Sequence, residues 1–320
     1  RIKMAEVNLN EQTKELLKKA RTGFPNEIKI IYKDEKAGFI RHDQAQQYLS
    51  GGNLIIEIDD ITCPDYTLTH ELLHLLVRIN NVPEIIFNLT TKNRNLDNNF
   101  LATGFELYNT VLHFDVYDMQ RQMGLFTEEI QDLYLKGITE TLEPEPEAEI
   151  DDVMVLRIVQ LFDALVFFGK EVQKVADVFE RDYPRAYRAA KQLFEVATKK
   201  GLAGVQGLHR AIIRVFTQFD ECLDDLGLMG MNLREFVTLT PVISERQLKL
   251  EVRQVFNVKN SQMHDVYQDK PAYIGLGMYN GQNSFVITAP TVDSDKFFKD
   301  LYGMKVEAFF DKFEFPYLKR

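Results

Sequence analysis

Hydrophobic positions near the start of the chain change from a helical to an alternating period. Apolar residues at helical spacing predict an amphipathic helix over residues 10–21. Turn residues then separate short strand-like segments, which predict a small sheet from residues 27–32, 38–41 and 53–59. The last segment is mostly apolar on both faces, which is typical of a strand inside a sheet.

Helical spacing dominates the rest of the chain. Two helices are predicted over residues 67–80 and 96–122. Further segments with a helical apolar period follow at residues 153–168, 172–179, 186–198 and 208–226. Near the end the period changes again, because Asn280-Gly281 separates two strand-like segments and predicts a hairpin of residues 273–278 and 284–288. Residues 291–295 are expected to cap a last helix.

An acidic segment divides these two parts of the chain. Seven carboxylates fall within thirteen positions, at Glu140, Glu143, Glu145, Glu147, Glu149, Asp151 and Asp152. Like charges repel and Pro144 and Pro146 break helices, so residues 140–152 are predicted to form a solvated linker. The expected fold is α+β, with a small sheet-plus-helices domain over residues 4–139 and a mostly helical lobe with a terminal β-hairpin over residues 153–320.

Composition narrows the class of protein. The 320 residues are 45% hydrophobic and 27% charged, close to the average of soluble globular proteins. A formal charge of −10 opposes attraction to phosphate backbones and anionic membranes, so neither nucleic acid nor membrane is an expected partner. Cys63 and Cys222 are too far apart for a paired zinc or redox motif. Reduced thiols and a plausible start at Met4 lead us to expect a cytoplasmic protein, with its oligomeric state open.

One segment carries a metal-binding pattern, His70-Glu71-Leu72-Leu73-His74. Histidines four residues apart lie on one face of a helix, so both imidazoles can reach one metal ion, for which zinc is the expected occupant. Glu71 follows the first histidine, where its carboxylate can accept a proton from water at the metal. Apolar residues on the remaining faces are expected to bury this helix and leave its polar edge lining a cleft.

This segment resembles the zincin superfamily of HExxH zinc metallopeptidases. Uncharged residues at Leu68, Leu72, Leu73 and Leu75 fit its longer pattern, as does the order of sheet, motif helix and second helix. The metzincin extension is missing, because Val77 and Asn80 stand where glycine and a third histidine would be needed. The resemblance is therefore gluzincin-like, and it implies a third ligand from a glutamate on a later helix.

Glu106 is the expected third ligand. In the predicted helix over residues 96–122, it forms a polar stripe with Thr110, His113 and Tyr117 on an element that is otherwise apolar almost all round. A buried carboxylate needs a partner, and zinc is a suitable one. The alternatives are that His113, Glu84 or Asp115 is the ligand, or that Glu106 is a structural carboxylate.

The resemblance implies hydrolysis of a peptide or protein, in which Glu71 accepts a proton from the attacking water and delivers it to the leaving amine. His113, Tyr108 and Tyr117 are candidates for stabilising the transition state. Residues 53–59 or 38–41 could hold an extended peptide by main-chain pairing. The alternative function is non-catalytic partner binding on a zincin scaffold with a structural or vestigial metal site. Residues 70–76 and 106–114 also bear a weaker resemblance to a bacterial family labelled IpaB/EvcA, which assigns no activity.

Overall fold

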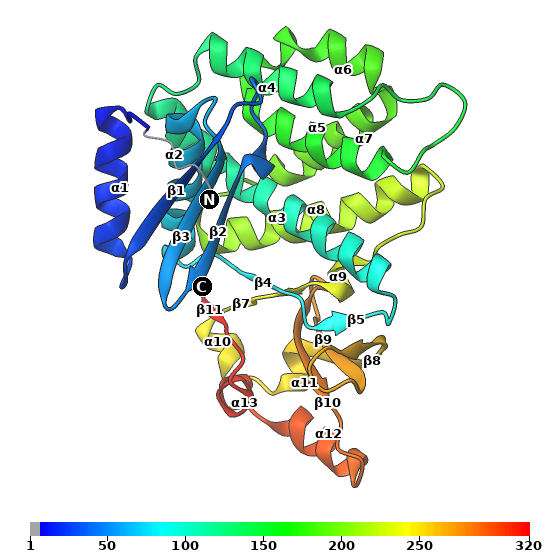
Figure 1. Ribbon diagram of the computed structural model, residues 1–320. Coiled ribbons are helices and arrows are strands. Elements are labelled where there is room, and N and C mark those ends of the chain that lie inside the picture. Colours follow the sequence, from blue (N-terminus) through cyan, green and yellow to red (C-terminus); the bar gives the residue numbers. More distant parts are fainter. Residues whose placement is uncertain (1–6) are drawn as a thin grey trace. The chain divides into compact units, whose positions relative to one another are not determined.

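The computed structural model describes residues 7–320, and the expected start at Met4 lies outside this range. The chain is a mixed α+β protein, as predicted (Figure 1). It divides into two compact units. Unit 1 comprises the described residues up to Asn80 together with Leu112–Tyr187, and unit 2 comprises Asn81–Val111 and Arg188–Arg320. The predicted boundary at residues 140–152 does not coincide with this division.

The sheet of unit 1 has the strand order β1-β3-β2. Its strands are β1 (Ile28–Glu35), β2 (Ala45–Ser50) and β3 (Asn53–Asp60). The central strand β3 pairs parallel with β1 and antiparallel with β2, so β1 and β2 are the edges. Alternating residues of β3, Leu54, Ile56 and Ile58, are buried in a shared apolar core, because side chains two apart lie on the same face of a strand.

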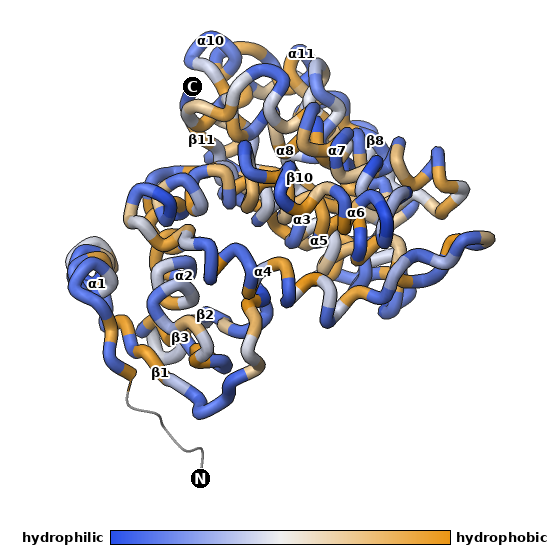
Figure 2. Tube along the Cα trace, turned by 90° about the horizontal axis from the view of Figure 1, so that it is seen from above, coloured by the Kyte–Doolittle hydropathy of each residue, from blue (hydrophilic) through white to orange (hydrophobic). Residues whose placement is uncertain are grey.

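Two helices complete this core, α1 (Glu11–Gly23) and α2 (Pro64–Ile79). Asn10 begins α1 by accepting a hydrogen bond from the backbone of Thr13. Most of α1 is hydrophilic (Figure 2), and it contributes Ala20 and a few flanking leucines to the core. The motif helix α2 is buried along nearly its whole length, as its sequence predicted.

The strand predicted at residues 38–41 is wrong. Gly38 adopts a positive φ of 75°, and Ile40 donates its backbone N–H to Leu133 in a helix rather than to a strand. After a short 3-10 helix η1 (His42–Gln44), the chain instead forms β2. Its Ala-Gln-Gln-Tyr-Leu-Ser sequence lacks the apolar alternation of a half-buried strand, because β2 is a mostly exposed edge.

Helices fill the remainder of unit 1. They are α4 (Glu128–Thr141), α5 (Met154–Phe168), the 3-10 helix η2 (Gly169–Lys174) and α6 (Ala176–Asp182), with the second part of α3 (Arg94–Gln122) and the start of α7 (Pro184–Thr198). The sequence interpretation did not include α4. The helix α5 is almost entirely buried.

The acidic segment at residues 140–152 is held by ion pairs inside unit 1 and is not a free linker. Asp151 pairs with Arg157, whose side chain is 1% exposed, and Glu145 accepts from Arg185 at 2.9 Å. The backbone N–H of Glu145 also donates to Asp182. These contacts neutralise part of the charge that predicted a solvated segment.

Unit 2 combines the first part of α3 and most of α7 with short elements and one larger sheet. Its helices are α8 (Gly204–Asp225), α9 (Leu233–Phe236), α10 (Glu245–Leu248), α11 (Val252–Val255), α12 (Ser294–Gly303) and α13 (Val306–Phe313). Its short strands are β4 (Ile85–Ile86), β6 (Thr238–Leu239), β7 (Val242–Ile243) and β11 (Leu318–Lys319).

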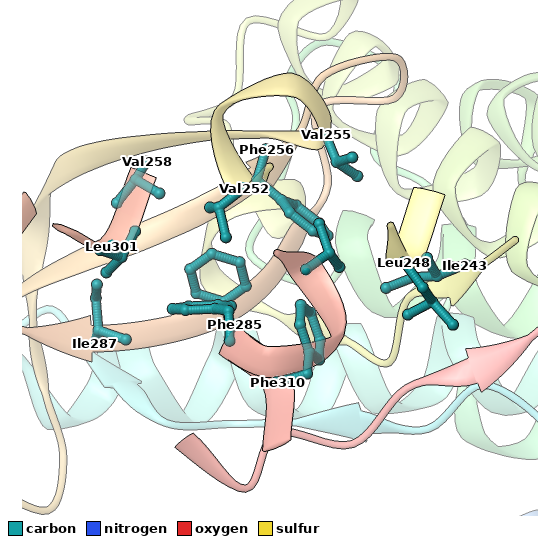
Figure 3. Close-up of a cluster of buried hydrophobic side chains, with 12 residues drawn as sticks. Ile243, Leu248, Val252, Val255, Phe256, Val258, Phe285, Ile287, Leu301 and Phe310 are labelled. Carbon is teal, nitrogen blue, oxygen red and sulfur yellow. The ribbon is translucent and has the colours of Figure 1, made fainter. Parts of the chain in front are cut away.

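The larger sheet of unit 2 is antiparallel, with the strand order β10-β9-β8-β5. Its strands are β5 (Leu89–Thr90), β8 (Phe256–Asp265), β9 (Pro271–Gly277) and β10 (Asn283–Thr288). The predicted hairpin is confirmed as β9–β10, but α12, α13 and β11 follow it. Aromatic and branched side chains from the sheet and these helices form the core around Phe256, Phe285 and Phe310 (Figure 3). In residues 7–320, no helix combines the length and apolar character needed to cross a membrane.

Candidate metal centre

Helix α2 places two histidines of the motif side by side. Pro64 begins the helix, and Leu68, Leu72 and Leu75 anchor it in the core of unit 1. The opposite side presents His70 and His74, whose ring centroids are 4.8 Å apart. Both side chains are buried, although the polar edge of this helix was expected to line a cleft.

His113 joins this pair from helix α3. Its Nε2 lies 2.9 Å from Nε2 of His74, and its ring centroid is 4.8 Å from those of His70 and His74. One ligand atom from each of the three residues lies within 4.8 Å of the others. Three imidazoles with one open position are a known zinc ligand set, so the group can hold a metal ion.

The protonation of the three histidines suits metal binding. Burial lowers the pKa of His70 and His74 well below the usual value, and neighbouring histidine charges add to the effect. Burial also lowers the pKa of His113, although Asp163 opposes this shift. A histidine must be neutral to offer a lone pair to a metal, so the site holds its ligands in the required form at neutral pH.

Asp163 on α5 fixes the orientation of His113. One carboxylate oxygen accepts from Nδ1 of His113, and the other accepts from the hydroxyls of Tyr117 and Tyr134. Burial alone would raise the pKa of Asp163, but His42, His113 and the hydrogen bonds lower it well below the usual range. The ionised carboxylate therefore keeps the proton of His113 on Nδ1 and turns Nε2 toward the other histidines.

His42 lies near the Asp163 oxygen that His113 does not contact. Its ring stacks on His70 with centroids 4.9 Å apart, and its Nδ1 is 3.3 Å from Asp163. Tyr117 donates its hydroxyl proton to Asp163, so the same hydroxyl accepts from Nε2 of His42 at 2.7 Å. His42, His113 and Asp163 form a second group that can hold a metal ion. Hydrogen bonds already engage both oxygens of Asp163, which favours the group of three histidines.

Two glutamines hold the polar groups on α2. Gln120 lies 3.4 Å from Nδ1 of His70 and donates to the Tyr66 carbonyl, which orients the imidazole. Gln47 of β2 donates to the Glu71 carboxylate at 2.7 Å. Burial raises the pKa of Glu71, and the hydrogen bond from Gln47 partly offsets this effect. A carboxylate with a raised pKa is suited to accept and release a proton near neutral pH.

The structure does not bring Glu106 to this group. Glu106 was expected to be buried, which is wrong: its side chain is exposed, about two turns before His113 on α3. Thr110, His113 and Tyr117 of the same predicted stripe are buried. Of the three alternatives, His113 lies with His70 and His74, whereas Glu84 and Asp115 are exposed and belong to neither group.

The three candidate transition-state stabilisers, His113, Tyr117 and Tyr108, do not lie together at one position of the site. His113 takes the position of a ligand, and Tyr117 is buried with its hydroxyl between Asp163 and His42. Tyr108 is buried in unit 2.

Sequence reasoning missed Asp163, Tyr134, Gln120 and Gln47, and it left His42 unplaced. The clearest available signal was Asp163, a lone carboxylate in the apolar segment over residues 158–168. A charge at such a position needs buried partners. Comparisons with protein families, curated proteins and solved structures find no match to this chain.

Proposed function

We propose that unit 1 is a zinc-dependent peptidase domain with His70, His74 and His113 as the metal ligands. The observation that carries this proposal is the convergence of three buried imidazoles, two of them from the HExxH motif, whose pKa values burial lowers. The hydrogen bond that Nδ1 of His113 donates to Asp163 supports it, because ligating histidines commonly donate their second ring N–H to a carboxylate.

A bound zinc ion would supply Lewis acidity for attack of water on a peptide carbonyl. Glu71 would hold the proton released by that water on its carboxylate and deliver it to the leaving nitrogen. Gln47 positions this carboxylate by donating to its Oε2. His70 is aligned by Gln120, and His113 by Asp163, so the chain's own side chains set the geometry of the ligands.

The edge strand β2 is the surface proposed to hold an extended substrate. Among residues 7–320, β2 pairs within its sheet with β3 alone, so its other side can pair with a peptide main chain. Of the sequence candidates for this role, β3 is the central strand and residues 38–41 are not a strand. The same strand carries Gln47, which links the proposed binding edge to Glu71.

A second function is favoured by one observation. His70, Glu71, His74 and His113 are each at most 8% exposed. Structural zinc sites are closed, so this burial also suits a metal that stabilises a partner-binding domain without catalysis.

The test compares the full chain with Glu71→Gln, using zinc analysis and cleavage of a broad peptide library. The unsubstituted protein should contain about one zinc per chain and cleave peptides. Glu71→Gln should keep the zinc and lose about 10²-fold or more of the activity. Glu15→Gln removes an exposed carboxylate on α1 and should change neither property.

The outcomes separate the alternatives. Zinc without cleavage in the unsubstituted protein would reject the peptidase and support the structural function. A protein purified without zinc and unable to bind it would reject both.

A further inference from the structure

A cavity of about 580 Å³ lies within unit 2, remote in sequence from the metal centre. Helix α8 forms one side, and short segments around β7, β9 and β10 form the others. This volume is within the range of sites that bind small molecules. The inference drawn from it is independent of the proposed peptidase function.

The charged side chains that line this cavity are all basic. They are Lys200, Arg210, Arg214 and Arg320, and the lining includes neither aspartate nor glutamate. Within residues 7–320, no carboxylate forms an ion pair with any of these four residues. Concentrating like charges in a cavity is unfavourable, and it creates a positive field that attracts anions.

Two guanidiniums are joined by one amide. When the amide oxygen of Gln206 faces them, it accepts from Arg320 Nη1 at 2.6 Å and from Arg210 Nη2 at 2.9 Å. Gln206 thus brings the two cations together without neutralising either. Each guanidinium has further N–H donors that an anion can engage.

Arg214 is fixed at the cavity by the end of α7. Its Nε donates to the Val196 carbonyl at 2.6 Å, and Nη2 donates to Ala197 at 3.1 Å. Burial lowers the pKa of Arg214, and the neighbouring Arg210 adds to this effect. A desolvated cation beside another cation would be stabilised by an anion.

His209 supplies an unused polar atom at the same wall. Its side chain is 6% exposed, and its Nε2 has no hydrogen-bond partner among the described residues. Buried polar atoms are rarely left unpaired, so a ligand would have to shift the His209 side chain to satisfy Nε2. His209 lines the same cavity as the arginine cluster, which remains the observation that points to a ligand.

The rest of the lining is largely apolar. Ile213, Val242 and Phe256 contribute to it, and Tyr279 is 90% exposed. A ligand that fills the cavity would therefore combine an anionic group with a less polar body.

We infer that this cavity is a binding site for a small molecule that carries phosphate groups. A phosphate group offers several oxygens and up to two negative charges, so it can accept from more than one guanidinium at once. A carboxylate has two oxygens and one charge, and it would leave more of the basic lining without compensation.

The test is calorimetric titration of the full chain with pyrophosphate, ADP, adenosine and succinate at low salt. Pyrophosphate and ADP should bind, whereas adenosine and succinate should bind at least tenfold more weakly. Arg210→Gln and Lys200→Gln remove exposed cations and should each weaken ADP binding about tenfold. Arg188→Gln removes an exposed arginine that does not line the cavity, so it should leave the affinity unchanged.

Three results would overturn the inference. One is the absence of pyrophosphate and ADP binding, and another is binding that Arg210→Gln does not weaken. The third is binding of adenosine or succinate as tight as that of ADP, which would indicate an apolar or carboxylate ligand.

Discussion

Asp163 on α5 binds Nδ1 of His113 on α3, fifty residues away in the sequence. The bond determines which nitrogen of His113 faces His74, so a residue outside the proposed ligand set of His70, His74 and His113 controls the geometry of one ligand. Tyr117 and Tyr134 donate to the same carboxylate and keep it ionised in a buried setting.

Asp163→Asn should therefore weaken zinc binding about 10- to 100-fold, because an amide cannot replace both accepting oxygens of the carboxylate. Competition with a chromophoric chelator would measure the affinity. Tyr134→Phe removes one donor and leaves Asp163 in place, so its effect should be smaller. Circular dichroism would confirm that both variants fold. Equal zinc affinity in folded Asp163→Asn and the unsubstituted chain would show that the carboxylate has no role at the metal.

His113 and Glu106 differ in their expected contributions to metal binding. His113→Ala removes an imidazole that lies against His74, so the purified variant should lose its zinc. Glu106→Gln alters an exposed side chain on the same helix and should retain about one zinc per chain. Elemental analysis of the two proteins distinguishes them. The reverse result would restore Glu106 as the ligand.

Local periodicity explains which part of the site could be predicted. His70, Glu71 and His74 are neighbours on one helix, so their shared location follows from spacing alone. His113, Asp163 and His42 come from other elements of unit 1, and only the packing of those elements brings them together.

The error at Glu106 has a physical basis. The helix over residues 94–122 contains apolar residues on every side, which indicated burial throughout. Its first part nevertheless exposes large apolar side chains, with Leu101 45% and Phe105 38% exposed. Of the four residues in the polar stripe, Glu106 is exposed, whereas Thr110, His113 and Tyr117 are buried.

Local sequence pattern also predicted some strands of the sheets and missed others. β3 and the β9–β10 hairpin were predictable, because one is strongly apolar and the other contains Asn280-Gly281. β2 and β8 were missed, because their polar residues do not show a period of two. Long-range pairing defines these strands more than local sequence does.

Gly137 provides a test of how α4 packs against the segment before His42. A Cβ at this position would lie 2.0 Å from the carbonyl oxygen of Ile40, so one backbone would have to move. Gly137→Ala should lower the free energy of unfolding by about 1–3 kcal/mol despite the better helix propensity of alanine. Denaturant titration would measure the loss.

Gly23→Ala is the matched control, since no atom lies within 4 Å of the added Cβ. Its stability should stay within about 0.5 kcal/mol of the unsubstituted chain. Equal stability of the two variants would contradict the close contact at Ile40.

His209 should make folding stability depend on pH. Burial lowers its pKa from 6.5 to about 4, and the neighbouring Arg210 adds to the effect. Between pH 4 and 6.5 the histidine is protonated more fully in the unfolded state than in the folded state. The contribution of neutral His209 to the free energy of unfolding is therefore fully present above pH 6.5, and it is lost as the pH falls toward 4. At pH 5 the loss should be about 2 kcal/mol.

Denaturant titrations at pH 7.5 and 5 measure this effect. The free energy of unfolding should fall by about 2 kcal/mol less in His209→Gln than in the unsubstituted chain when the pH is lowered. An equal loss in both proteins would show that His209 is not the group responsible.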